Sequence, residues 1–162
     1  VPGIGFVVIS DAFREAISQR RPVAFSTDLV DTLNREETGE TPFTPPVQTI
    51  YALREALKEL LEEGVATRIA NYRNIAKALR DGLAGLELSL LVPREHLSNT
   101  MTTVKLPQGL SYAGLHQPLK GQEYLIYKSQ GHLSETTFRL GTVGVISLED
   151  VQGFLVALGR LL

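Results

Sequence analysis

The sequence predicts an α+β fold in which a small, mostly antiparallel sheet has helices packed on one face. Two long segments between residues 46 and 83 carry apolar residues at helical spacing, whereas short runs after residue 86 have the apolar and β-branched composition of strands. In chain order the second half reads helix, strand, strand, helix, strand, strand, helix. That order is typical of an α+β sandwich.

The first part of the chain predicts one strand and two helices. Residues 5–9 (Gly-Phe-Val-Val-Ile) form an apolar run with the length and β-branched composition of a strand that is buried on both faces. Ser10 and Asp11 can cap a helix over Asp11–Ser18, because their side-chain oxygens accept bonds from free amides. A weaker helix is predicted over Ser26–Glu37.

A proline-rich segment precedes the first long helix. Prolines bar a helix as far as Pro46, but proline suits the first helical turn, where no amide donor is needed. We therefore expect Thr44 at or near the N-cap of a helix that Gly64 ends. A second long helix is predicted over Val65–Leu83, and its cations, Arg80 among them, lie off the apolar stripe on a face that we expect to be solvated.

The remaining elements are shorter. Predicted strands cover Leu86–Val92, Met101–Leu106, Tyr124–Tyr127 and a run from Thr137 into a glycine-rich turn at Gly144. Predicted helices cover Ser111–Leu119 and the C-terminal segment that Ser147–Asp150 opens with capping-box spacing.

One charged residue, Arg139, interrupts the apolar strand that begins at Thr137. Since strand side chains alternate between faces, Arg139 points away from Phe138 and Leu140. If that face meets solvent, Arg139 is an ordinary surface arginine, which is the usual case for a lone arginine in a strand. If the face lines a cleft, the planar guanidinium can bind a carboxylate through two parallel hydrogen bonds. The local sequence leaves both interpretations open.

The helix start after Thr44 is a second candidate anion site. Free amides, a hydroxyl and the positive end of the helix dipole together suit a phosphate group. The alternative, which the local sequence favours, is that Thr44 only caps its own helix.

Composition excludes several functional classes. The 162 residues are enough for one core, and a net charge of −2 offers no basic field for nucleic acid. Without cysteine the chain has no disulfide, thiolate nucleophile or cysteine metal site. His96, His116 and His132 lie too far apart to suggest a metal site. No apolar run reaches the roughly 18 residues of a membrane span, so no membrane partner is expected.

Three segments, in order, form a recognisable set: Val1-Pro2-Gly3-Ile4-Gly5-Phe6, then Thr41-Pro42-Phe43-Thr44-Pro45 leading into Ala52-Leu53-Arg54-Glu55-Ala56-Leu57, and then Phe138-Arg139-Leu140-Gly141. The set resembles the C-terminal half of class V aminotransferases, which use pyridoxal phosphate. Ile126-Tyr127 and Gln130-Gly131 are most similar to the branch that acts on 2-aminoethylphosphonate and pyruvate.

The resemblance implies roles for particular residues. Arg139 matches the family arginine that binds the substrate carboxylate, and Thr44 matches the threonine that reaches the cofactor phosphate of the neighbouring subunit. Thr41 stands where some relatives carry a tyrosine, so a second phosphate contact stays open. The cofactor-bearing lysine lies just before the Pro-Gly turn matched by Pro2-Gly3, so it is expected upstream of Val1. No catalytic residue and no metal ligand is expected in this chain.

The resemblance also implies a domain organisation. Residues 1–45, with a strand and helices, are expected to be a remnant of the large cofactor-binding domain and a linker. Residues 46–162 are expected to be the C-terminal small domain of a fold-type-I aminotransferase.

The function implied is amino transfer from 2-aminoethylphosphonate to pyruvate by a longer, pyridoxal-phosphate-dependent parent enzyme. The isolated chain is expected to be inactive because it lacks the lysine. One alternative is an alanine or serine–glyoxylate aminotransferase, and another is a non-catalytic dimerisation and substrate-clamp domain. The resemblance implies that the partners are small amino and keto acids and a second copy of the chain in a homodimer. It also implies a cytoplasmic location.

Overall fold

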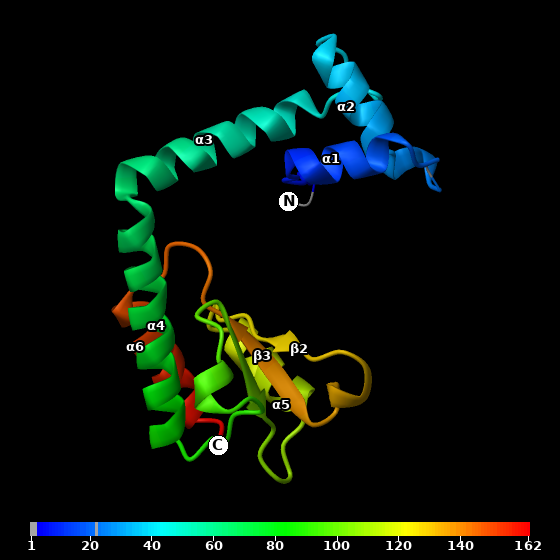
Figure 1. Ribbon diagram of the computed structural model, residues 1–162. Coiled ribbons are helices and arrows are strands. Elements are labelled where there is room, and N and C mark those ends of the chain that lie inside the picture. Colours follow the sequence, from blue (N-terminus) through cyan, green and yellow to red (C-terminus); the bar gives the residue numbers. More distant parts are fainter. Residues whose placement is uncertain (1–2, 22) are drawn as a thin grey trace. The chain divides into compact units, whose positions relative to one another are not determined.

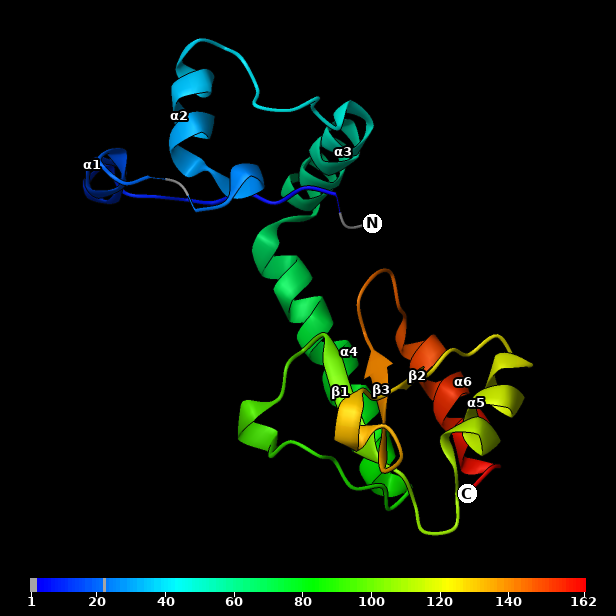
Figure 2. The same cartoon turned by 90° about the vertical axis from the view of Figure 1, so that its right-hand side faces the viewer.

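The computed structural model describes residues 3–21 and 23–162 (Figures 1 and 2). It divides into two compact units, Val1–Glu62 and Glu63–Leu162. The predicted boundary after residue 45 concerns the large and small domains of a whole aminotransferase, and it stays a prediction.

The first unit is built from helices. α1 spans Asp11–Ser18, α2 spans Leu29–Glu37 and α3 begins at Val47 and runs to Glu63. The Ser10 hydroxyl accepts a bond from the Phe13 amide, so the predicted cap and bounds of α1 are confirmed. α2 begins later than predicted, because a single 3-10 turn occupies Phe25–Thr27 and Asp28 caps the helix.

The predicted strand over residues 5–9 is wrong. These residues are extended but belong to no sheet, and Phe6 is 80% exposed. A strand is stabilised by hydrogen bonds to a neighbouring strand. An apolar β-branched run by itself therefore gives only a tendency to form a strand. No strand pairs with this run in the described part of the chain.

The second unit holds a three-stranded sheet. β1 (Met101–Lys105) and β2 (Tyr127–Lys128) flank the central β3 (Thr137–Gly141), and both pairs are antiparallel. The helices are α4 (Val65–Gly85), α5 (Tyr112–Lys120) and α6 (Leu148–Gly159). The predicted α+β class is therefore confirmed.

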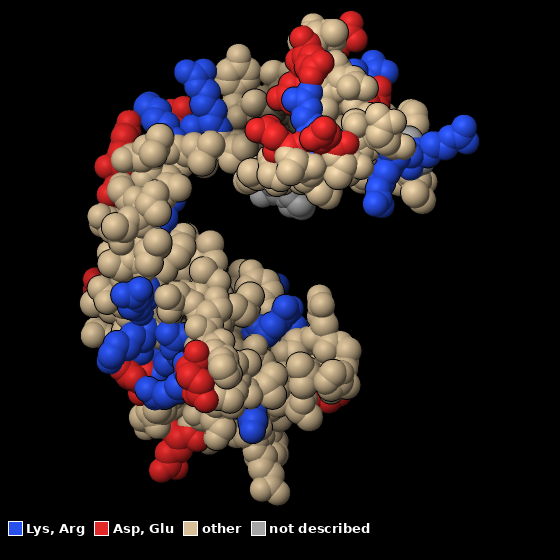
Figure 3. Space-filling model, in the orientation of Figure 1, with Lys and Arg blue, Asp and Glu red and all other residues tan. Residues whose placement is uncertain are grey.

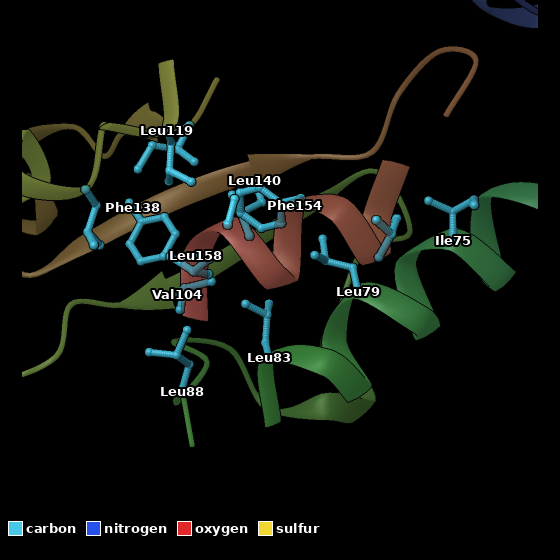
Figure 4. Close-up of a cluster of buried hydrophobic side chains, with 14 residues drawn as sticks. Ile75, Leu79, Leu83, Leu88, Val104, Leu119, Phe138, Leu140, Phe154 and Leu158 are labelled. Atoms are coloured by element: carbon cyan, nitrogen blue, oxygen red, sulfur yellow. The ribbon is translucent and has the colours of Figure 1, made fainter. Parts of the chain in front are cut away.

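The core lies between the sheet and the helices (Figure 4). Phe138 and Leu140 contribute the buried face of β3, and Leu83 and Leu158 meet them from α4 and α6. α4 and α6 can approach closely because Gly82 has no side chain: a Cβ there would lie 2.1 Å from Cδ1 of Leu155. Burial of this apolar surface is the main stabilising contribution to the unit.

Two strands of the second unit are shorter than predicted. The run Leu86–Val92 contributes only a bridge between Leu90 and Val104, because its start closes α4 through a bond from the Leu88 amide to the Leu83 carbonyl. The run Tyr124–Tyr127 contributes only Tyr127 to β2, since Tyr124 likewise bonds back to α5. In both places the helix end competed with the strand for the same backbone donors.

The C-terminal helix begins as the capping-box spacing predicts. The Ser147 hydroxyl accepts a bond from the Asp150 amide, and the Asp150 carboxylate accepts one from the Ser147 amide. The carboxylate also accepts from the Ser147 hydroxyl, and these two bonds to the carboxylate, the one from the backbone amide first, lower the pKa of Asp150 below its ordinary value.

Candidate functional site

Arg139 lies at the centre of β3, on the face of the sheet opposite the core. Its neighbours in strand register are Thr103 on β1 and Tyr127 on β2. Directly opposed residues share a face of the sheet, so a threonine, the arginine and a tyrosine form one row across the three strands. Arg139 is half-buried and Tyr127 is 54% exposed, so this row can be reached from outside the unit.

The guanidinium of Arg139 is held at one end and unpaired at the other. Its Nη2 donates to the Lys128 carbonyl at 3.0 Å, whereas its Nε is buried without a hydrogen-bond partner. Within the residues that the structure describes, no carboxylate pairs with Arg139. A buried donor without a partner costs free energy, and an anion that accepts from it recovers that cost.

Glu135, four residues before Arg139 in the chain, is paired with another cation. Lys128 Nζ pairs with Glu135 Oε1 at 2.6 Å, and this hydrogen bond and charge lower the pKa of Glu135. Glu135 therefore neutralises Lys128, and no acidic side chain among the described residues forms an ion pair with Arg139. Such an arginine suits a carboxylate, whose two oxygens match its donors.

Thr44 lies in the first unit, just before α3. The Pro46 carbonyl accepts the first helical bond, from the Ile50 amide, so Pro46 occupies the cap and Thr44 lies two residues before it. Thr44 is exposed, and within the described residues its hydroxyl has no hydrogen-bond partner. The hydroxyl is therefore not used in capping α3. It remains free to donate to, or accept from, a ligand.

A cavity of about 370 Å³ was not predicted from the sequence. It lies at the end of β3, between Gly141, Thr142 and the start of α6, and Tyr124 and Phe154 also line it. Its walls are mostly apolar, and the carboxylate of Asp150 is occupied in the capping box. The glycine-rich turn after Leu140 was the one signal for this hollow, because Gly144 adopts a left-handed φ of 104° that lets the chain turn away from the sheet.

The other chemical groups show no second centre. No cluster of histidine and carboxylate side chains that could hold a metal ion occurs in the described part of the chain. Lys58, Lys77 and Lys128 form surface ion pairs with acidic side chains. Nor does any helix among the described residues combine the length and apolar character needed to cross a membrane.

Comparisons with known proteins give a consistent picture, although no family model matches the chain. The chain is 36% identical over 157 residues to a 2-aminoethylphosphonate–pyruvate transaminase of Syntrophobacter fumaroxidans, covering 93% of the chain and 42% of that protein. It is 34% identical over 163 residues to the transaminase of the same name from Aeromonas hydrophila, covering 98% and 42%. An uncharacterised aminotransferase of Methanocaldococcus jannaschii is 31% identical over 153 residues, covering 93% and 40%.

A solved structure agrees. The alanine–glyoxylate aminotransferase of a Nostoc species superposes with a TM-score of 0.83 at 26% identity, over 94% of this chain and 42% of that one. In sequence and in fold the chain is similar to the C-terminal portion of class V aminotransferases. It spans less than half the length of the relatives it matches.

The site residues fit the cofactor chemistry of a class V aminotransferase. Such a site needs donors for a phosphate and for a carboxylate. The Thr44 hydroxyl is exposed and has no partner among the described residues, and Nε of Arg139 is unpaired. Pro2, one half of the Pro-Gly turn that resembles the family, lies outside the described residues. The assignments of Thr44 and Arg139 remain proposals, which the next section develops.

Proposed function

We propose that this chain is part of a pyridoxal-phosphate-dependent aminotransferase that moves the amino group of 2-aminoethylphosphonate to pyruvate, giving phosphonoacetaldehyde and alanine. The observation that carries the proposal is the guanidinium of Arg139, whose buried Nε lacks a partner on the face opposite the core. Support for the substrates comes from the relatives named 2-aminoethylphosphonate–pyruvate transaminase.

Each residue has a distinct task in this proposal. Pyridoxal phosphate, when bound, supplies the electron sink that makes amino transfer possible. Arg139 binds and orients the carboxylate of pyruvate or alanine, and its bond to the Lys128 carbonyl limits the rotation of the guanidinium. Thr44 offers its hydroxyl to the cofactor phosphate of a neighbouring subunit.

A second candidate is amino transfer from alanine or serine to glyoxylate. The similarity to the Nostoc alanine–glyoxylate enzyme favours it, although at lower identity than the phosphonate relatives show. Both reactions use a substrate carboxylate, so Arg139 has the same task in each. A purely non-catalytic clamp, the homodimer and the cytoplasmic location stay predictions.

The test compares the two half-reactions in the enzyme that contains this chain. 2-Aminoethylphosphonate has no carboxylate, whereas pyruvate has one. We expect Arg139→Lys to weaken pyruvate binding about ten-fold or more, because lysine keeps the charge but lacks the planar pair of donors. The half-reaction with 2-aminoethylphosphonate should change far less. Stopped-flow measurement of both half-reactions gives the ratio.

A matched control separates this effect from any general effect of replacing an arginine by a lysine. Arg73 is an exposed arginine on α4, and Arg73→Lys should leave both half-reactions unchanged. Equal losses in the two half-reactions of Arg139→Lys would rule out the carboxylate role. Turnover of alanine with glyoxylate, and none of 2-aminoethylphosphonate with pyruvate, would select the second candidate.

A further inference from the structure

A pocket of about 240 Å³ lies beside α4, away from the row that contains Arg139. Two arginines line it, Arg80 from α4 and Arg94 from the loop before β1. The rest of the lining is apolar and comes from Ala84, Leu88, Leu90 and Val92. Two guanidinium groups beside an apolar wall form an arrangement that the function proposed above does not use.

Among the described residues, the hydrogen-bond partners of Arg80 are neutral groups. Its Nη1 donates to the Ser98 carbonyl at 2.9 Å, and its Nη2 lies 3.4 Å from the side-chain oxygen of Asn99. Burial, and then the charge of Arg94, lower the pKa of Arg80. A partly buried cation beside a second cation is stabilised when an anion joins them. The expectation of a fully solvated face does not hold for Arg80.

No acidic residue is among those that line the pocket, and the neighbouring carboxylate of Asp81 is shared between cations. Asp81 pairs with Lys77 at 2.5 Å and with Arg94 at 3.5 Å, so two cations share a single carboxylate. Figure 3 shows Lys and Arg side chains gathered over α4. Arg94 is 66% exposed, so part of its guanidinium is open to a ligand. The local charge therefore favours an anion.

The apolar wall is already formed. The segment that carries Leu88, Leu90 and Val92 is held to the outer edge of β1 by bonds from the Leu91 amide to the Thr103 carbonyl and from the Lys105 amide to the Ser89 carbonyl. Because the backbone is fixed, a ligand that covers these side chains does so without the cost of ordering a loop.

We propose that this pocket binds a small organic carboxylate with a short hydrocarbon chain. The carboxylate lies between Arg80 and Arg94, and the hydrocarbon lies against Leu88, Leu90 and Val92. The proposal does not depend on the aminotransferase reaction, because no residue that lines the pocket belongs to the face of Arg139. The alternative is that Arg80 only ties the loop at Ser98 and Asn99 to α4.

The probe is hexanoate, followed by two-dimensional amide NMR on the 162-residue chain. We expect saturable shifts within residues 80–94, with the affinity falling as ionic strength rises. Hexanol has the same hydrocarbon without the charge, and acetate has the charge without the hydrocarbon. Both should bind clearly more weakly than hexanoate.

Variants assign the effect to the arginines. Arg94→Gln replaces an exposed side chain, so the fold should persist, and it should weaken hexanoate binding about ten-fold through the loss of a charge-assisted bond. Arg73→Gln removes an exposed charge on α4 that does not line the pocket, and it should leave the affinity unchanged. The proposal is overturned if hexanol or acetate binds as well as hexanoate, if the two variants behave alike, or if no shift occurs in residues 80–94.

Discussion

The two compact units have similar helix caps and similar apolar spacing, but they differ in how much of their apolar surface is buried. α1 and α6 both begin with a serine cap, and α3 and α4 both carry apolar residues at helical spacing. Yet no described residue of the first unit is buried, whereas the core of Phe138, Leu83 and their neighbours lies wholly in the second. An amphipathic helix supplies one half of an interface, and burial follows only where a sheet or another helix supplies the other half.

The two proposed ligand residues follow the same division. Arg139 is held in a strand between two paired strands, with one donor bonded to the Lys128 carbonyl. Thr44 lies on an exposed segment before a helix and has no bond of its own among the described residues. A rigid support makes Arg139 suited to orienting a substrate, while Thr44 can only add a contact to a group that something else positions.

The largest expected contrast is between two phenylalanines. Phe138 has 0% exposure and Phe6 has 80%. Phe138→Ala should lower the free energy of unfolding by about 3–5 kcal/mol, because it removes buried contacts and leaves a cavity. Phe6→Ala should change it by less than about 0.5 kcal/mol. Urea unfolding followed by circular dichroism measures both changes. Similar losses for the two variants would show that Phe6 also contributes to a stabilising core.

The next contrast sets ligand binding against stability. Thr44→Val keeps the size of the side chain and removes the hydroxyl. We expect it to weaken cofactor retention by about 1–3 kcal/mol in the enzyme that contains this chain, the range for a hydrogen bond to a charged group. The unfolding midpoint should not move, since the hydroxyl has no partner within the chain.

Mixed dimers sharpen the Thr44 prediction. One subunit carries Thr44→Val and the other lacks the cofactor-bearing lysine. If Thr44 serves the neighbouring subunit, the one remaining cofactor of this mixed dimer is held by the intact threonine of the other subunit. When both substitutions lie in the same subunit, the remaining cofactor faces the valine and should be held more weakly. A mixed dimer in which Thr44 affects the cofactor of its own subunit would contradict the assignment across subunits.

Two glycines of α4 separate packing from helix propensity. At Gly85 an added Cβ meets no atom within 4 Å, so Gly85→Ala should stabilise the protein by up to about 1 kcal/mol. At Gly82 the Cβ would overlap Cδ1 of Leu155 at 2.1 Å and approach its Cγ at 3.0 Å. Gly82→Ala should therefore destabilise it by about 1 kcal/mol despite the same gain in propensity. Thermal unfolding gives the sign of the stability change for each variant. A stabilising Gly82→Ala would mean that Leu155 can repack freely.

The smallest contrast is between the two serine caps. Ser147→Ala should cost about 1 kcal/mol of global stability, because its helix packs in the core. Ser10→Ala should leave the global unfolding midpoint unchanged, since α1 has no buried residue. Equal shifts for the two variants would show that α1 unfolds together with the core.

The Ser147 cap also predicts a pH dependence. The folded pKa of Asp150 is lowered from 3.8, so its contribution is complete above that value and is lost as the pH falls through the lower folded pKa. Asp81 and Glu135 have lowered pKa values too and share this sign. Comparing the acid unfolding of the wild type with that of Asp150→Asn isolates the share of Asp150. A variant with the same slope below pH 3.8 would exclude the capping carboxylate as a contributor.

The sequence by itself determined the features that depend on neighbouring residues. Helical spacing gave α3 and α4, serine hydroxyls gave the caps at Ser10 and Ser147, and strand alternation placed Arg139 opposite the core face. These features follow from backbone sterics and short-range hydrogen bonds, which the local residues fix.

Only the tertiary structure decided which extended runs became strands and which donors stayed unpaired. Residues 5–9 read as a strand but pair with no strand among the described residues, while Leu86–Val92 gave its first residues to the end of α4. The fold brings Arg139 to the Lys128 carbonyl and Arg80 into one pocket with Arg94, and neither pair is adjacent in the sequence. It also leaves Nε of Arg139 buried without a partner. A strand and a ligand site both require partners brought by the fold, and no local pattern names those partners.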